Sequence, residues 1–221
     1  MEGREKEIKG WFEQCNAIWV HDGDPKSPHA ELTSGKCSNA YFNCPEVLKK
    51  PMFNLALAER LVVELRKNRI DIVEDKIDWV IGSPYSAITF SYEVAKLLNA
   101  IHGFTEKEQK PGSKKMLWQR MTIPEGSKVL QIEELITTSQ TFVNVRQAVE
   151  EGNKYPVNFL DEVGVIVHRP PKLPADYGDR KIVSLIEQEV WAVEPEDCKL
   201  CKKGSPRFKP KSHWAELTGK S

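Results

Sequence analysis

The chain has 221 residues, of which 40% are hydrophobic and 29% charged. This length suits one large domain, or one domain with a small appended part. The 32 basic and 32 acidic side chains cancel, so the chain lacks the basic excess that is typical of nucleic-acid-binding domains. No apolar stretch approaches the roughly 18 residues of a membrane span, and the charged N-terminus lacks the apolar core of a secretory signal. We therefore expect a cytoplasmic protein with no nucleic-acid or membrane partner, and five cysteines at no disulfide-framework spacing fit a reducing compartment.

The hydrophobic pattern predicts alternating helices and strands. Apolar residues at three- and four-residue steps predict helices, and short apolar runs predict strands. The predicted helices are 4–20, 52–69, 86–100 and 139–151. The predicted strands are 77–83, 101–108, 116–123, 127–135, 162–169 and 181–188. The remaining segments are predicted to be a loop with short strands at 21–44, a mobile, lysine-rich loop at 107–116, and an irregular tail after 188.

The alternation through 77–170 predicts a parallel sheet with right-handed crossovers. In such sheets, ligands bind outside the carboxyl ends of the strands. Three segments follow predicted strands and are therefore candidate binding loops: 82–87, 133–141 and 168–169.

The segment 129–141, VLQIEELITTSQT, has a composition suited to a sugar phosphate. An apolar run delivers two adjacent carboxylates, which can accept hydrogen bonds from vicinal hydroxyls. A turn rich in hydroxyl side chains then leads into a helix, whose N-terminus favours anions. Taken alone, the segment is equally consistent with an ordinary capped helix that follows a strand, with two solvated glutamates.

The order of residues in this segment resembles the ribose-5-phosphate-binding loop of type I phosphoribosyltransferases. Further segments are similar to the orotate phosphoribosyltransferase family within that group, in the same order along the chain: 29–43, 78–98, 104–110, 165–169 and the tail 194–212. The resemblance implies an α/β fold with a mostly parallel, twisted sheet flanked by helices. It also implies a single domain over 1–221, with a core at about 50–188 and a small hood built from about 1–49 and 189–221.

The resemblance further implies transfer of a phosphoribosyl group from phosphoribosyl diphosphate to orotate, in pyrimidine nucleotide biosynthesis. Positive charge develops on the ribose in the transition state and negative charge on the departing diphosphate, so carboxylates, cations and a water-excluding lid are needed. By resemblance, Glu133 and Glu134 serve the ribose, and Lys107 and Lys110, with Mg²⁺, serve the diphosphate. The loop 107–116 is the expected lid.

The same resemblance implies which residues bind the rest of the substrates. Arg169 is expected to pair with the carboxylate of the base, for which a planar two-pronged donor is suited. A homodimer is expected, because in this family the loop often serves the neighbouring subunit's site. The 5-phosphate is expected to be held by Thr137, Thr138, Ser139, Gln140 and Thr141.

Several positions depart from the family pattern. Glu134 stands where an Asp is usual, Ser139 and Gln140 replace glycines, and 83–87 lacks two glycines of the pyrophosphate loop. Glu106 replaces the leading Arg of the flexible loop, and a later His of that loop is also replaced. Two alternatives therefore stay open: a non-catalytic regulator that binds phosphoribosyl diphosphate or a nucleotide, and a phosphoribosyltransferase that acts on another base.

No protein ligand for a metal is assigned from the sequence. Mg²⁺ is expected to be held mainly by the substrate's own oxygens. The five histidines show no metal spacing and are read as structural or exposed: His21, His29, His102, His168 and His213. Cys198 and Cys201 are read as two thiols in a turn of the tail, and the alternative is half of a zinc site, which needs two further ligands. The other cysteines that could approach them are Cys15, Cys37 and Cys44.

Overall fold

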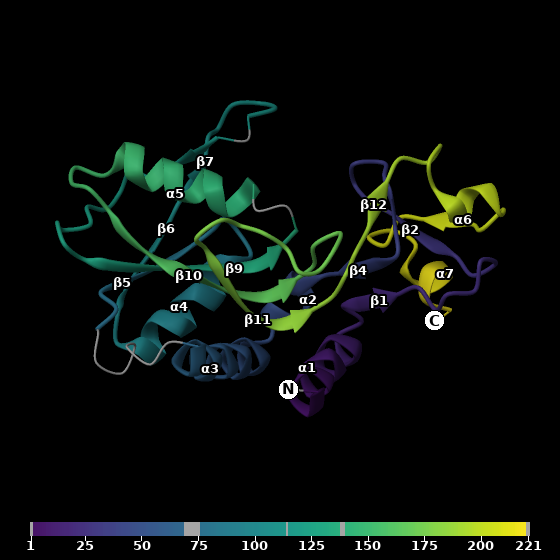
Figure 1. The fold of residues 1–221 in the computed structure, drawn as a ribbon, viewed down its shortest axis with the longest axis horizontal. Helices are drawn as coiled ribbons and strands as arrows, with labels where there is room; N and C mark the ends of the chain where they lie inside the picture. Colours follow the sequence, from purple (N-terminus) through teal and green to yellow (C-terminus); the bar gives the residue numbers. More distant parts are fainter. Residues whose placement is uncertain (1, 69–75, 114, 138–139, 220–221) are drawn as a thin grey trace.

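The main sheet has five parallel strands in the order β11-β10-β9-β5-β6 (Figure 1). The computed structural model describes residues 2–68, 76–113, 115–137 and 140–219. The predicted parallel sheet is therefore confirmed, and the carboxyl ends of its strands lie at one edge. The strands are β5 (Trp79–Gly82), β6 (Ile101–Phe104), β9 (Lys128–Ile136), β10 (Asn158–His168) and β11 (Lys181–Glu187).

Helices cover both faces of this sheet (Figure 1). On one face lie α3 (Pro51–Asn68) and α4 (Ala87–Leu98), with α5 (Gln140–Gly152) on the other. The pleat of β9 explains how one strand serves two cores, because adjacent side chains point to opposite faces. Val129 packs in the cluster that includes α5, whereas Leu130 packs in the cluster that includes α3 and α4.

The prediction of one helix over 4–20 is wrong over 15–20. Helix α1 (Glu2–Gln14) ends earlier, and β1 (Ile18–Val20) pairs antiparallel with β4 (Ala40–Phe42). Asn16 has a φ of 51°, a left-handed conformation that Asn adopts more readily than most residues and that ends a helix. The Ala17 N–H then donates to the Phe12 carbonyl, so the chain turns where the apolar spacing alone predicts continuation.

A second, four-stranded sheet joins the two ends of the chain, in the order β12-β3-β2-β13. Strands β2 (His29–Glu31) and β3 (Cys37–Ser38) come from the N-terminal part, and β12 (Ala192–Val193) and β13 (Arg207–Phe208) from the tail. The prediction of an irregular tail is therefore wrong, because the tail also forms the short helices α6 (Lys199–Lys202) and α7 (Trp214–Thr218). A further short helix, α2 (Cys44–Leu48), lies in the N-terminal part.

The predicted strands at 101–108 and 116–123 are only partly formed. A two-stranded antiparallel ribbon, β7 (Glu106–Lys107) with β8 (Met116–Leu117), stands at the base of the predicted lid and extends from the main sheet (Figure 1). Residues 118–123 of the second predicted strand form no strand, and Trp118 and Ile123 are buried in the core beside α5. Among the described helices, none is both long and apolar enough to cross a bilayer.

Gly82, the last residue of β5, is required by close packing of the strand on α4. An added Cβ would lie 2.1 Å from the Ser91 Oγ and 2.8 Å from the Ser91 Cβ. The Ser91 hydroxyl is held in turn by the His102 Nε2, 2.8 Å away. No L side chain fits there without displacing α4.

Gly82→Ala is expected to lower the free energy of unfolding by about 1–3 kcal/mol, the usual cost of overpacking a dense core. Chemical denaturation of the purified variant measures this change. Gly10→Ala is the matched control, because a Cβ at Gly10 in α1 meets nothing within 4 Å and should leave stability equal or slightly raised. Equal effects of both substitutions would contradict the packing argument.

Candidate active site

A hydrogen bond joins the loop after β5 to the carboxyl end of β9. The register pairs Gly82 with Ile132, so the next residues, Ser83 and Glu133, are neighbours. The Ser83 hydroxyl donates to the Glu133 carboxylate, and the Gln131 amide Nε2 donates to its other oxygen at 2.8 Å. Arg146 of α5 donates to the Gln131 oxygen at 3.1 Å and so fixes the amide's orientation. Glu133 is therefore held on the α5 side of the sheet.

Glu133 is almost fully enclosed, with 1% of its surface exposed. Burial raises the pKa of Glu133 to about 8, because the charged form loses its hydration. The Ser83 hydrogen bond acts against this shift, while the negative charge of Glu134 adds to it. Burial therefore favours the protonated form of the Glu133 carboxyl in the ligand-free site.

Glu134 has different neighbours, since the next residue on a strand points to the other face. Its side chain is partly buried, and burial raises the pKa of Glu134, whereas its own backbone N–H and the charge of Lys107 lower it. The Cys44 thiol lies 3.6 Å from the Glu134 carbonyl oxygen. Glu133 and Glu134 are thus adjacent near the end of β9 but contact different residues.

Lys107 stands over the loop that follows β5. Its Nζ lies 5.0 Å from the centre of the Tyr85 ring, a cation–π contact, and Tyr85 is itself 61% exposed. Lys110 is exposed in the turn between β7 and β8. Glu106, which stands where the family resemblance expects an Arg, accepts hydrogen bonds from the Arg120 guanidinium. The structure thus brings Lys107 to the strand ends but leaves Lys110 in solvent.

The turn from β9 into α5 carries the predicted phosphate site. Thr137 follows β9, and Gln140 and Thr141 form the exposed first turn of α5. Thr138 and Ser139 lie outside the described residues. The Gln140 amide donates to Asn144 one turn later.

Two further residues support this turn: His168, which lies in the candidate binding loop 168–169, and Tyr177, which the sequence did not single out. The Tyr177 hydroxyl donates to the Thr137 carbonyl at 3.2 Å, and the His168 Nε2 lies 2.9 Å from the same hydroxyl. The His168 Nδ1 faces a Glu187 oxygen at 2.8 Å. His168 lies near the end of the predicted strand 162–169 and is the last residue of β10, so its position was a usable signal. Tyr177 lies in a loop without periodicity and gave none.

Arg169 follows β10 at the same edge of the sheet, where its N–H donates to the Ile136 carbonyl at 2.8 Å. Burial lowers the pKa of Arg169, with the Cys44 thiol and the Tyr41 hydroxyl acting the other way. Within the described ranges its Nε is buried without a hydrogen-bond partner, and no carboxylate pairs with it. Arg169 therefore presents an unmatched cation next to residues from the N-terminal part of the chain.

The raised pKa of Glu133 predicts a pH-dependent effect of Glu133→Gln. Between pH about 4.5 and about 8 the folded protein keeps a proton that the unfolded chain has lost, so wild-type stability falls as pH rises through this window. The neutral amide has no such dependence. The melting temperature of the variant minus that of wild type should rise by at least about 5 °C from pH 5 to pH 9.

Thermal unfolding at the two pH values measures this difference. The matched control is Glu125→Gln, because Glu125 is exposed and its substitution should give the same difference at both. A constant difference for Glu133→Gln would show that the carboxyl is already ionised in the folded protein.

Curated orotate phosphoribosyltransferases are similar to this chain over most of its length. The protein from Desulforamulus reducens is 34% identical over 200 residues, which cover 90% of this chain and 96% of that protein. The protein from Caldicellulosiruptor bescii is 35% identical over 184 residues, covering 83% and 88%. No protein-family model matches the chain.

Solved structures agree on the fold. Orotate phosphoribosyltransferase from Aeropyrum pernix superimposes with a TM-score of 0.54 at 16% identity, covering 81% of this chain and 92% of that one. A phosphoribosyltransferase from Corynebacterium diphtheriae gives 0.54 at 17% identity, covering 84% and 96%. The expected type I phosphoribosyltransferase fold is confirmed. Given the identity to curated relatives across nearly the whole chain, the protein belongs to the orotate phosphoribosyltransferase family.

Proposed function

We propose that the chain transfers the 5-phosphoribosyl group of phosphoribosyl diphosphate to orotate, giving orotidine 5′-phosphate and diphosphate. Relatives that share a third of its residues carry the name of this activity. The observation that carries the choice of base is Arg169, a half-buried guanidinium whose Nε lacks a partner among the described residues. A planar base with a carboxylate supplies the acceptor that such a group needs.

In this proposal, three strand ends at one edge of the sheet each bind a different part of the substrates. Lys107 serves the departing diphosphate beside the loop after β5, where it already lies over Tyr85. The turn after β9 receives the 5-phosphate through the first N–H groups of α5 and the hydroxyls of Thr137 and Thr141. Arg169 after β10 holds the base. The predicted contacts of Thr138 and Ser139 stay predictions.

The two acids take different roles in this scheme. Glu134, which is partly exposed, faces the ribose hydroxyls and the positive charge that develops on the ring. Glu133, buried and protonated without ligand, positions Ser83 and through it the diphosphate loop. Mg²⁺ bound with the substrate would offset part of the cost of ionising Glu133, because a nearby positive charge favours the carboxylate.

Mg²⁺ is a proposed cofactor, and the residues at this edge suit it. A hard cation prefers oxygen ligands and usually keeps substrate phosphates and waters. The Glu134 carboxylate and the Thr137 hydroxyl supply such oxygens at the end of β9. When bound, Mg²⁺ neutralises charge on the diphosphate as it leaves. The protein's part is to hold the ribose, the phosphate and the base in line.

We also propose a homodimer in the cytoplasm. Lys110 is exposed on the ribbon that extends from the main sheet (Figure 1). A lysine so placed can reach the diphosphate of a neighbouring subunit, as in the family this chain resembles. Light scattering of the purified protein tests the dimer directly.

The first assay mixes the protein with phosphoribosyl diphosphate, Mg²⁺ and orotate and follows the loss of orotate absorbance. We expect turnover, and Arg169→Lys should lower kcat/KM for orotate by about tenfold or more, because a lysine keeps the charge but not the two-pronged geometry. The KM for phosphoribosyl diphosphate should change little. Arg66→Lys is the control, since Arg66 is exposed in the last turn of α3.

Two other results would change the assignment. Thermal protection by phosphoribosyl diphosphate without turnover would favour the non-catalytic binding protein. The glycines replaced in the two phosphate-binding loops would then account for the lost activity. Turnover with another base, and none with orotate, would move the substrate.

Lys107→Ala and Lys110→Ala should each lower kcat by about 10- to 1000-fold, the range for losing one charged group that acts on the leaving diphosphate. Lys154→Ala is the matched control, because Lys154 also stacks on an aromatic ring, Tyr155, at 5.2 Å. Unfolding the Lys110→Ala and Arg169→Ala variants together and refolding the mixture gives mixed dimers. These mixed dimers should regain activity if each site takes residues from both subunits. Wild-type kcat in both lysine variants would show that the diphosphate leaves elsewhere.

A further inference from the structure

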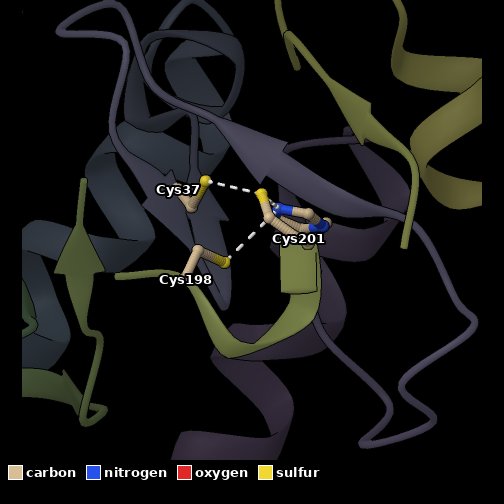
Figure 2. A group of neighbouring side chains, drawn as sticks. Cys37, Cys198 and Cys201 are labelled. Carbon is tan, nitrogen blue, oxygen red and sulfur yellow. Dashed lines mark hydrogen bonds between the residues drawn. The ribbon is translucent and has the colours of Figure 1, made fainter. Parts of the chain in front are cut away.

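Four side chains with metal-binding atoms converge between the ends of the chain, apart from the proposed active site. They are His29 of β2, Cys37 of β3, Cys198 just before α6, and Cys201 within α6. Their ligand atoms all lie within 4.8 Å of one another. Figure 2 shows the three cysteine side chains pointing toward a common centre. Figure 1 shows α6 far from α5 and the main sheet.

The distances within this group match the edges of a zinc tetrahedron. With Zn–S of about 2.3 Å and Zn–N of about 2.0–2.1 Å, a tetrahedron has edges of roughly 3.8 Å between sulfurs and roughly 3.6 Å between sulfur and nitrogen. The Cys37 and Cys201 sulfurs are 3.5 Å apart. The His29 Nε2 lies 3.7 Å from the Cys198 sulfur and 3.4 Å from the Cys201 sulfur.

The hydrogen bonds around His29 fix the tautomer that a metal needs. The Ser205 hydroxyl donates to the Ser27 carbonyl at 2.6 Å, so its oxygen accepts from the His29 Nδ1, 2.7 Å away. The Nδ1 therefore carries the proton, and the Nε2 lone pair points at the sulfurs. A second hydrogen bond of this kind orients most metal-binding histidines.

The surroundings also suit the charge of a bound site. Zn²⁺ with three thiolates and a neutral imidazole carries a net charge of −1. The Arg207 guanidinium lies 3.9 Å from the Cys37 sulfur and pairs with Glu31 at 3.1 Å, so a cation is held beside the sulfurs. The backbone N–H groups of Leu200 and Cys201 point at the Cys198 sulfur. Such donors stabilise a thiolate.

The four-stranded sheet has little hydrophobic core of its own, so a bound metal would add stability to it. Its strands are two or three residues long. The buried hydrophobic clusters found in the described residues contain none of its strand residues. Small units without a core are usually stabilised by disulfides or metals.

We propose that His29, Cys37, Cys198 and Cys201 bind one structural zinc ion, which joins the N-terminal strands to the C-terminal tail. Three protons leave the thiols as the ion binds, and no oxidant is needed. All four protein ligands are present, which leaves no open position for a water or substrate and makes the site structural. The tail pair was only half a site in the sequence, and His29, read there as structural or exposed, supplies the ligand that no spacing indicated.

The direct test is the zinc content of the untagged, reduced protein after passage over a chelating resin. We expect about one zinc per chain. Replacement by Co²⁺ should give the visible absorption of a tetrahedral site together with sulfur-to-cobalt charge-transfer bands. Removal of zinc by a strong chelator should lower the melting temperature by at least about 5 °C, and added Zn²⁺ should restore it.

Variants locate the ion. Cys201→Ser and His29→Gln should lose most of the bound zinc, whereas the matched controls Cys15→Ser and His213→Gln should keep one per chain, since neither residue is in the cluster. Metal-free wild-type protein that takes up no Co²⁺ would overturn the proposal. So would a count of three free thiols instead of five in the denatured, chelated protein, because a Cys37–Cys201 disulfide would then explain the short distance.

Discussion

The register of the parallel sheet is the constraint on which the proposed site depends. Gly82, the last residue of β5, pairs with Ile132, whereas Ile136 and His168, the last residues of β9 and β10, pair with each other four residues further along. This register brings Ser83 against Glu133, and it allows the Arg169 N–H to reach the Ile136 carbonyl. A shift of β9 by one residue would exchange the faces of Glu133 and Glu134 and would disconnect the diphosphate loop from the acids.

Near the end of β9, Glu133 and Glu134 differ in burial and in contacts, although the sequence presents them as a pair. Glu133 has lost water and gained two hydrogen-bond donors, and burial dominates its protonation. Glu134 remains partly exposed and within the field of Lys107. The Glu134 side chain extends further from the strand than the Asp that is usual in the family, and the positive charge of Lys107 already acts on it. The departure from the family pattern is therefore compatible with a working ribose site.

The sequence predicted the main sheet well because its strands are apolar runs and its helices have clear periodicity, as in 127–135 and 139–151. It failed where one residue overrides the period, as Asn16 does in ending α1. It also failed where a site is assembled across the chain. His29 and Ser205 lie 176 positions apart, and their hydrogen bond follows from tertiary structure alone. The roles of the acids, Lys107 and Arg169 stay predictions. Their positions were accessible from the sequence because Glu133 and Glu134 lie in the second half of β9 and Arg169 directly follows β10.

The proposed zinc site and the proposed base site are linked through a short piece of chain. Cys37 in β3 precedes Tyr41 in β4 by four residues, and the Tyr41 hydroxyl acts on Arg169. The Asn39 side chain between them accepts a hydrogen bond from the Trp191 N–H at 2.9 Å, which ties this piece to the tail. Holding Cys37 therefore limits how far Tyr41 can move from Arg169. Because the four-stranded sheet has little core of its own, a metal that joins the two ends of the chain would restrain Tyr41 beside Arg169.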